Sequence, residues 1–270
     1  MRIEPSYGRL AIDWRELWRY RELLYFLVWR DLKVRYKQTA IGVAWVILQP
    51  LFTMAIFTLF FGVLARMPSE GVPYPLFCFA GLVPWTFLAN SLGQAAGSVV
   101  SNANLITKVY FPRLLVPLSV LLGNLPDLAL SLLVLVALMA FYGFHPPLAA
   151  LLWLSLSMAL AFAVAAGAGL WLAALNVRYR DVRHTVPFLT QVWFFVTPVV
   201  YPLELLPQSL QRLYRFNPMT GVVEAFRGGL LHGELKGGWL FPASVATALI
   251  LLATGLRHFR RTERSFADVV

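Results

Sequence analysis

The side chains that commonly carry chemistry are few in this sequence and stand far apart. Asp127 is the only acidic residue well inside an apolar stretch, and the four histidines, His145, His184, His232 and His258, show no HExxH spacing. An enzyme working inside a membrane needs clustered acids, a metal cluster, or a nucleophile with its base. We therefore predict no catalytic residue and no metal site. One enzyme class, a membrane-embedded glycosyl- or acyltransferase, is kept only as an alternative.

Nucleotide chemistry is equally poorly represented. A phosphate-binding loop requires glycine, then lysine, then serine or threonine in succession. None of the four lysines, Lys33, Lys37, Lys108 and Lys236, follows a glycine. The chain is therefore expected to bind no cofactor itself. If ATP drives it, another polypeptide must bind that ATP.

Aromatic side chains provide the remaining chemical signal. Trp193, Phe194 and Phe195 lie deeper in an apolar stretch than an interfacial aromatic belt would, and Tyr201 follows at its end. Aromatic faces stack on sugar rings through C–H contacts and allow a glycan to slide. Ordinary packing against lipid or other helices is the alternative reading.

The elements that must position these side chains are membrane spans. Of the 270 residues, 59% are hydrophobic and only 13% are charged, which is about half the charged fraction of an average soluble domain. A helix needs ~20 apolar residues to cross a bilayer. Six stretches qualify, the fifth being short: about 41–64, 74–97, 114–142, 148–175, 186–201 and 238–256. The sequence therefore predicts an all-α integral membrane protein with six transmembrane helices.

The basic residues predict how these spans are oriented. Segments 1–40, 98–113, 176–185 and 257–270 hold 18 of the 23 lysines and arginines, and the alternating segments hold the other five. This asymmetry predicts a cytoplasmic N-terminus (1–40), a six-span domain (41–256) and a cytoplasmic tail (257–270). The net charge of +10 fits the anionic cytoplasmic leaflet better than it fits nucleic acid.

Three segments outside the spans are unusual, and one of them is a polar loop at 98–113 that is expected to face the cytoplasm. Residues 14–37 place apolar side chains at helical spacing with charged side chains opposite, which predicts an amphipathic helix in the cytoplasmic interface. The apolar set is Trp14, Leu17, Trp18, Leu24, Tyr25, Val28, Leu32 and Tyr36. Residues 202–237 are too apolar for a simple loop and too interrupted by proline and glycine for a span. They predict short helices that dip into the outer leaflet.

Six long stretches carry motifs in order along nearly the whole chain. They are RDLKVRYKQTAIGVAWVILQPL (30–51), GLVPWTFLANSL (81–92), NLITKVYFPRLLVPLS (104–119), NVRYRDVRHTVPFLTQVWFFVTPVVYPLELLP (176–207), FNPMTGVVEAFR (216–227) and RTERSFADVV (261–270). Together they resemble the permease subunits of ABC exporters for cell-surface polysaccharides. The resemblance is greatest to O-antigen exporter permeases, with teichoic acid and capsule exporter permeases as relatives.

The resemblance implies a homodimer of six-span subunits in a bacterial cytoplasmic membrane, assembled with two copies of a separate ATPase that binds ATP and Mg. The cargo would be a polysaccharide on a lipid diphosphate carrier. The helix at 14–37 would be an interfacial gate helix, the turn at 98–113 would dock in the ATPase, and the segment around 203–232 would be a re-entrant external gate.

Three groups of residues are predicted to serve that export. The predicted channel-lining residues are Trp45, Trp193, Phe194, Phe195 and Tyr201. The cations predicted to receive the head group at the gate are Arg30, Lys33, Arg35 and Lys37. The alternative is that these cations only hold this segment on the cytoplasmic side of the membrane. The residues predicted to couple to the ATPase are Asn102, Asn104 and Lys108. Asp127 is expected to face the protein interior and to form hydrogen bonds there.

Overall fold

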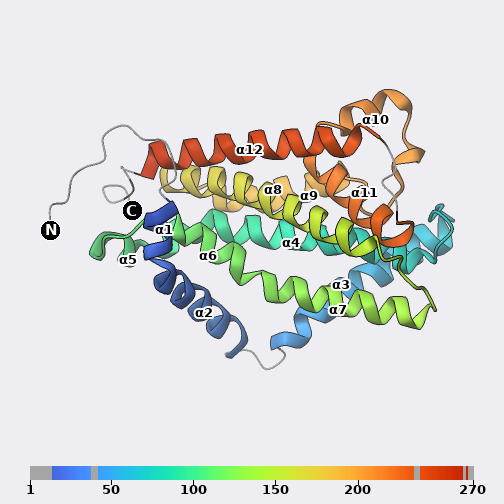
Figure 1. Ribbon diagram of the computed structural model, residues 1–270, viewed down its shortest axis with the longest axis horizontal. Coiled ribbons are helices and arrows are strands. Elements are labelled where there is room, and N and C mark those ends of the chain that lie inside the picture. The colour runs from blue at the N-terminus through green and yellow to red at the C-terminus, as the bar shows by residue number, and fades with distance from the viewer. Residues whose placement is uncertain (1–13, 38–41, 234–237, 264–265, 267–270) are drawn as a thin grey trace.

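The computed structural model describes residues 14–37, 42–233, 238–263 and 266, and every regular element among them is a helix (Figure 1). The all-helical class predicted from the sequence is confirmed. Five candidate spans are long and apolar enough to cross a membrane. They are Ala44–Leu64, Tyr74–Ser101, Leu115–Phe141, Ala150–Arg178 and Leu240–Thr262. Their continuous apolar sequence leaves lipid or protein as the only suitable surroundings.

Helix α4 (Tyr74–Ser101) is the centre of the bundle. In its most apolar stretch 78% of the residues are buried, and it packs against α3, α6, α7, α8, α9 and α11. Helix α8 (Ala150–Arg178) approaches it closely, since a Cβ on Gly169 would lie 3.0 Å from that of Ala95. Small residues thus allow close helix packing, as is usual in membranes.

Helix α3 (Gly42–Phe57) continues into a π-helical segment, η1 (Thr58–Leu64), and lies at the edge of the bundle. Only 6% of the residues in its most apolar stretch are buried. Trp45, Phe52 and Phe60 are each more than half exposed. One face of this span therefore has no protein neighbour within the described part of the chain.

The third span is interrupted. Helix α6 (Leu115–Gly123) and helix α7 (Leu125–Phe141) meet at Asn124, within the range predicted as one continuous span, 114–142. Pro126 explains the break, because it lacks an N–H and its ring crowds the carbonyl four residues earlier.

Helices α1 (Trp14–Arg19) and α2 (Arg21–Lys37) lie outside the bundle of long helices (Figure 1). Leu27 is buried and Val28 partly buried on the side of α2 that faces the bundle. The helical spacing groups Trp18 and Tyr25 with Val28 on one apolar side of the segment. In the structure, however, Trp18 is 70% exposed and Tyr25 is 63% exposed. The outward side of α2 therefore combines aromatic and charged side chains, which suits the interface between lipid and water.

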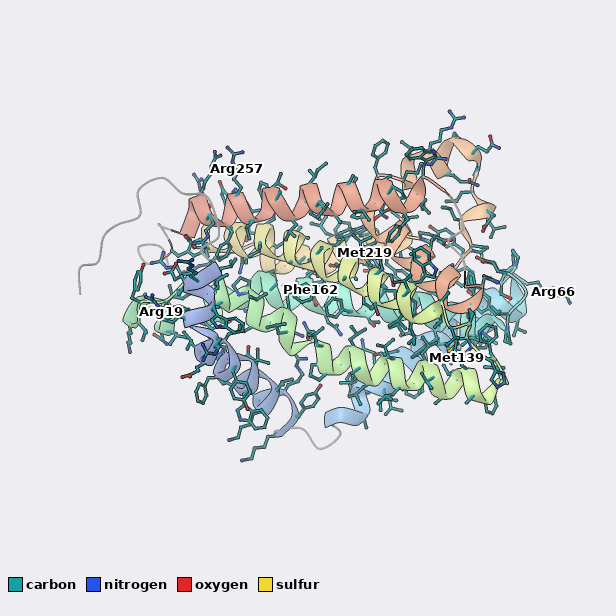
Figure 2. All side chains as sticks on the ribbon, in the orientation of Figure 1. Arg19, Arg66, Met139, Phe162, Met219 and Arg257 are labelled. Atoms are coloured by element: carbon teal, nitrogen blue, oxygen red, sulfur yellow. The ribbon has the colours of Figure 1, made fainter. Side chains whose placement is uncertain are left out.

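The two ends of the bundle differ in what they carry. Helices α1 and α5 (Ala103–Lys108) lie at one end, here the α5 end, and α10 (Gln208–Tyr214) lies at the other, the α10 end (Figure 1). Arg19 and Arg257 lie at the α5 end, and Arg66 lies at the α10 end (Figure 2).

Helix α8 finishes at the α5 end, whereas α12 (Leu240–Thr262) begins at the α10 end (Figure 1). The chain between them contains α9 (Val182–Phe195), the short η2 (Leu203–Leu205), α10 and α11 (Pro218–Leu231). Helix α9 has only 14 residues and covers part of the predicted fifth span, 186–201. Every residue of α11 after Pro218 is buried.

Two hydrophobic cores hold these helices together. The larger one joins α4, α8, α11 and their neighbours along the bundle. The smaller one lies at the α5 end and joins Leu27 of α2, Ile106 of α5, Phe111 and the ends of α8 and α12. Phe266 beyond α12 is fully buried in this second core.

Candidate functional site

A cavity of about 460 Å³ lies between α3, α4, α7 and α9. Six aromatic side chains line it: Trp45, Phe57, Trp85, Phe87, Phe194 and Phe195. Polar groups converge on it as well, including Gln49, Asn90, Asn124, Asp127 and Gln191. A concave site with aromatic walls and a few polar groups is typical of a binding site for an organic molecule.

The aromatic walls are fixed by ring contacts. Phe194 stacks on Phe57 with ring centroids 5.6 Å apart and meets Trp85 edge-on at 5.4 Å. Phe195 is 56% exposed, and Trp45 on the facing helix is 57% exposed. Three of the five predicted channel residues, Trp45, Phe194 and Phe195, are thus brought together around this cavity.

The other two predicted channel residues lie elsewhere. Trp193 is partly buried against the main core, and its indole Nε1 donates a hydrogen bond to Asn217 Oδ1 at 2.9 Å. The Tyr201 hydroxyl donates to the Phe195 carbonyl at 2.8 Å and lies 3.1 Å from the Tyr214 hydroxyl. Both side chains anchor the turn after α9.

A polar group that we call the Arg35 cluster borders the cavity. It consists of Arg35 and Tyr36 from α2, Gln94 from α4, Asn124 at the α6–α7 break, and Asp127 from α7. Arg35 Nη1 lies 2.6 Å from Asp127 Oδ2 and 3.0 Å from Asn124 Oδ1, and Nη2 donates to Gln94 Oε1 at 2.5 Å. Tyr36 also donates a hydrogen bond to the Asp127 carboxylate. Asp127 therefore faces protein and forms hydrogen bonds, as the cost of burying a carboxylate requires.

The other three predicted gate cations differ from Arg35 in their surroundings. Arg30 pairs with the neighbouring Asp31 at 2.8 Å and is 46% exposed. Lys33 and Lys37 lie on the exposed side of α2. The structure thus divides the predicted gate cations into one that reaches the cavity edge and three that face outward.

A second polar group, here the Arg227 cluster, lies beyond the end of α9. Arg227 of α11 is 1% exposed, and its Nη2 donates to the carbonyls of Pro198 and Val199 at 3.0 and 2.6 Å. Its guanidinium lies 3.7 Å from the ring centroid of Phe77 and 3.5 Å from Glu224. These contacts satisfy two backbone carbonyls where the chain is not helical, so that neither is left without a donor.

The predicted coupling residues lie at the α5 end. Asn102 precedes α5 and donates from Nδ2 to the Ser98 carbonyl at 2.8 Å, while Asn104 and Lys108 are exposed. Ile106 is buried in the second core and anchors α5 to it. Tyr110, which sequence reasoning did not single out, is 78% exposed beside them.

Sequence reasoning missed the partner of Asp127 and the whole Arg227 cluster. Arg35 and Asp127 are 92 residues apart, so no local pattern connects them. A signal did exist for Arg227, because Glu224 and Arg227 stand three residues apart in an otherwise apolar segment. Such a pair in apolar surroundings indicates burial with mutual compensation.

Comparisons with known proteins agree with one another. The sequence profile of the family described as ABC-2 type transporter matches residues 22–231. The chain is 33% identical over 266 residues to the O-antigen export system permease protein RfbA of Myxococcus xanthus, covering 95% of this chain and 98% of that protein. It is 27% identical to the RfbA protein of Klebsiella pneumoniae over 92% of this chain and 95% of that protein. The polysialic acid transport protein KpsM of Escherichia coli is 24% identical over 87% of this chain and 92% of its own length.

Proposed function

This chain belongs to the ABC-2 type transporter family, a family of multi-pass membrane permeases, and on that premise we propose that it exports a lipid-linked polysaccharide of the O-antigen type. The observation that carries this proposal is the similarity to an O-antigen export permease over 95% of this chain and 98% of the relative. The aromatic walls of the cavity support it, because aromatic faces suit sugar rings.

Export of this kind requires a source of energy outside the chain. The sequence lacks a Gly-Lys-Ser/Thr element, and permeases of this family are not enzymes themselves. The family membership implies an ABC ATPase as partner. We propose that two copies of a separate ATPase bind and hydrolyse ATP with Mg, and that they dock at the α5 end through Asn102, Asn104 and Lys108.

We propose six membrane crossings with both termini in the cytoplasm. Five are the long spans, and the sixth is α9 with the turn that follows it. The supporting observation is that α8 finishes at the α5 end and α12 begins at the α10 end. Helices α10 and α11 then form a re-entrant segment on the external side. The gathering of 18 of 23 basic residues in the predicted cytoplasmic segments supports this orientation.

The cargo path is proposed to lie between two copies of the chain. The exposed apolar faces of α3 and α9 are the faces that a second copy would cover, and Trp45, Phe194 and Phe195 would line the path there. Trp193 within α9 and Tyr201 in the turn after it would shape that path. Arg30, Lys33, Arg35 and Lys37 on α2 would receive the diphosphate head group, since arginine and lysine bind phosphate oxygens strongly.

Surface labelling of intact bacteria tests this function. In a strain that makes the lipid-linked glycan but lacks this chain, we expect no glycan on the cell surface. Co-expression of the chain with its ATPase should restore binding of a glycan-specific antibody. The matched control is the same pair with the phosphate-binding lysine of the ATPase replaced by alanine. Surface glycan that is independent of the chain would contradict the proposal.

A capsular polysaccharide is the second candidate cargo. The similarity to the polysialic acid transport protein KpsM favours it, but at 24% identity rather than 33%. The same labelling assay decides between the two when it is run in a strain that makes both glycans. Teichoic acid is the third candidate cargo, and the assay tests it when it is repeated in a strain that makes a lipid-linked teichoic acid.

A further inference from the structure

Two donors from α2 converge on a single carboxylate in the Arg35 cluster. Arg35 Nη1 lies 2.6 Å from one oxygen of Asp127, and the Tyr36 hydroxyl donates to the other. A guanidinium and a hydroxyl aimed at one small anion resemble the donor set that binds a phosphate group. Here the anion that they bind is part of the protein.

This carboxylate stands at the edge of the cavity rather than in the depth of the core. Asp127 and Asn124 are both among the cavity-lining residues. The Asp127 side chain is 13% exposed and that of Arg35 is 25% exposed. Arg35 and Tyr36 do not line the cavity themselves, but both donate to a carboxylate that does, so an anion in the cavity that displaced Asp127 would meet these two donors.

The contact holds α2 against the broken third span. Arg35 comes from a helix outside the bundle, and its partners Asn124 and Asp127 flank the α6–α7 break. Withdrawing Arg35 from Asp127 with no replacement would separate the two charges of the ion pair, which is unfavourable to a modest degree because both side chains are partly exposed. Exchanging Asp127 for another anion removes the Arg35 half of that cost, because Arg35 keeps a charged partner, and it leaves only the Asp127 carboxylate, which lines the cavity, without its ion-pair partner.

We propose, on the premise of the proposed function, that Arg35 and Tyr36 form a binding site for the phosphate group of the lipid-linked cargo, which the Asp127 carboxylate occupies until the cargo displaces it. Asp127 is then an internal competitor. It holds α2 closed against the third span in the absence of cargo and yields Arg35 when a phosphate arrives.

A diphosphate is suited to win this competition. It carries more negative charge than one carboxylate and presents several acceptor oxygens, so that it can bind the arginine in a bidentate manner. Tyr36 is suited to be a donor to either anion, because burial and the contact with Asp127 raise its pKa to about 12. The hydroxyl therefore keeps its proton at neutral pH.

Binding of radiolabelled farnesyl diphosphate to the purified full-length chain tests the exchange directly. The protein is held in phosphatidylcholine nanodiscs and binding is read by scintillation proximity. Asp127→Asn keeps the size and an acceptor oxygen but removes the competing charge, so we expect its Kd to be about tenfold lower than that of the natural chain. Probe binds only to molecules in which Asp127 has left Arg35. The apparent Kd therefore equals the intrinsic Kd divided by the fraction of such molecules. Arg35→Ala should abolish saturable binding.

Asp31→Asn is the matched control. It also removes one carboxylate from the neighbourhood of an α2 arginine, but it lies away from the cavity, and its Kd should equal that of the natural chain. If Asp127→Asn fails to assemble, Asp127→Ser removes the same charge and replaces it in the test. Farnesol, which has the same chain without phosphate, should not compete.

Several results would overturn the inference. They are equal affinity of the Asp127→Asn and natural chains, an equal gain in the Asp31→Asn chain, and saturable binding in the Arg35→Ala chain. Equal competition by phosphatidylglycerol would assign the site to membrane lipid and remove the cargo from it. None of these results depends on export. Failure of the natural chain in the surface-labelling assay would instead overturn the proposed function.

Discussion

The Arg35 and Arg227 clusters lie at opposite sides of the cavity, and each supplies hydrogen-bond donors where a helix is broken. They differ in how firmly the arginine is held. Each arginine serves a place where a helix is broken: Arg227 binds the carbonyls of Pro198 and Val199 after α9, and Arg35 contacts Asn124 between α6 and α7. Arg227 is 1% exposed, whereas the Arg35 side chain is 25% exposed. The helix that carries the arginine accounts for the difference, because α11 is buried in the bundle and α2 lies outside it.

The comparison teaches that one residue type can act as a fixed brace or as an exchangeable contact, according to burial. A carbonyl without a partner inside a membrane costs several kcal/mol, so the donor that satisfies Val199 must stay in place. The partners of Arg35 lie at a cavity edge, where another group can replace one of them. We therefore expect changes at Arg227 to act on folding and changes at Arg35 to act on cargo handling.

The largest effect is expected from Arg227→Ala. It leaves the Pro198 and Val199 carbonyls and the Glu224 carboxylate without their shared partner, which should cost about 3–5 kcal/mol of folding free energy. The yield of folded protein after detergent extraction and its thermal unfolding midpoint measure this loss. Arg212→Ala, at an exposed position of α10, is the matched control. An unchanged midpoint for Arg227→Ala would mean that Arg227 does not stabilise the turn after α9.

Gly81→Ala should damage the same brace from the other side. A Cβ at position 81 would lie 2.3 Å from the Val199 carbonyl oxygen and 2.7 Å from Arg227 Nη2, so both must move. Overpacking of this kind costs about 1–3 kcal/mol. Gly93→Ala on the same helix meets nothing within 4 Å and should leave stability unchanged. Equal thermal midpoints for the two variants would mean that the Val199 contact adapts freely.

The helices of this fold could be predicted from sequence because their signals are local. Apolar runs mark the long helices, and the proline and glycine groups after Tyr201 mark a segment that is not a simple span. Breaks are not local in that sense. Pro50, Pro84 and Pro187 all lie inside continuous helices, whereas the third span breaks just before Pro126. The polar partner at that break is Arg35, about ninety residues earlier, and only the folded chain brings the two together.

The candidate site was predictable to a similar extent. Aromatic character pointed to Trp45, Phe194 and Phe195, which do share a cavity. It also pointed to Trp193, which lies as deep in the same apolar stretch as Phe194 and Phe195. A helix turns by 100° per residue, so adjacent aromatic side chains cannot all face one cavity. The direction of each depends on packing partners such as Asn217, which no local pattern identifies.

A smaller effect on stability is expected at the Arg35 cluster. Arg35→Ala should lower folding free energy by only about 1 kcal/mol, because both side chains of the ion pair are partly exposed and water can replace much of the contact that Asp127 loses. A double-mutant cycle with Asp127→Asn should give a coupling energy of about 0.5–3 kcal/mol. Thermal unfolding of the four chains measures it. A loss as large as that of Arg227→Ala would show that both clusters are fixed braces.

The smallest effect on stability is expected from Phe195→Ala, which probes the cavity between the two clusters. Phe195 is 56% exposed, so its truncation should change folding free energy by no more than about 0.5 kcal/mol. Export should nevertheless fall, because the cavity loses one aromatic wall against which sugar rings can stack. Surface-glycan labelling together with the amount of assembled protein separates these two quantities. Phe141→Ala, at an 80% exposed position outside the cavity lining, is the matched control and should leave both unchanged. If Phe195→Ala lowered assembly and export in proportion, Phe195 would support the fold as Arg227 does. The exchangeable contacts would then be confined to α2 and its contact with Asp127.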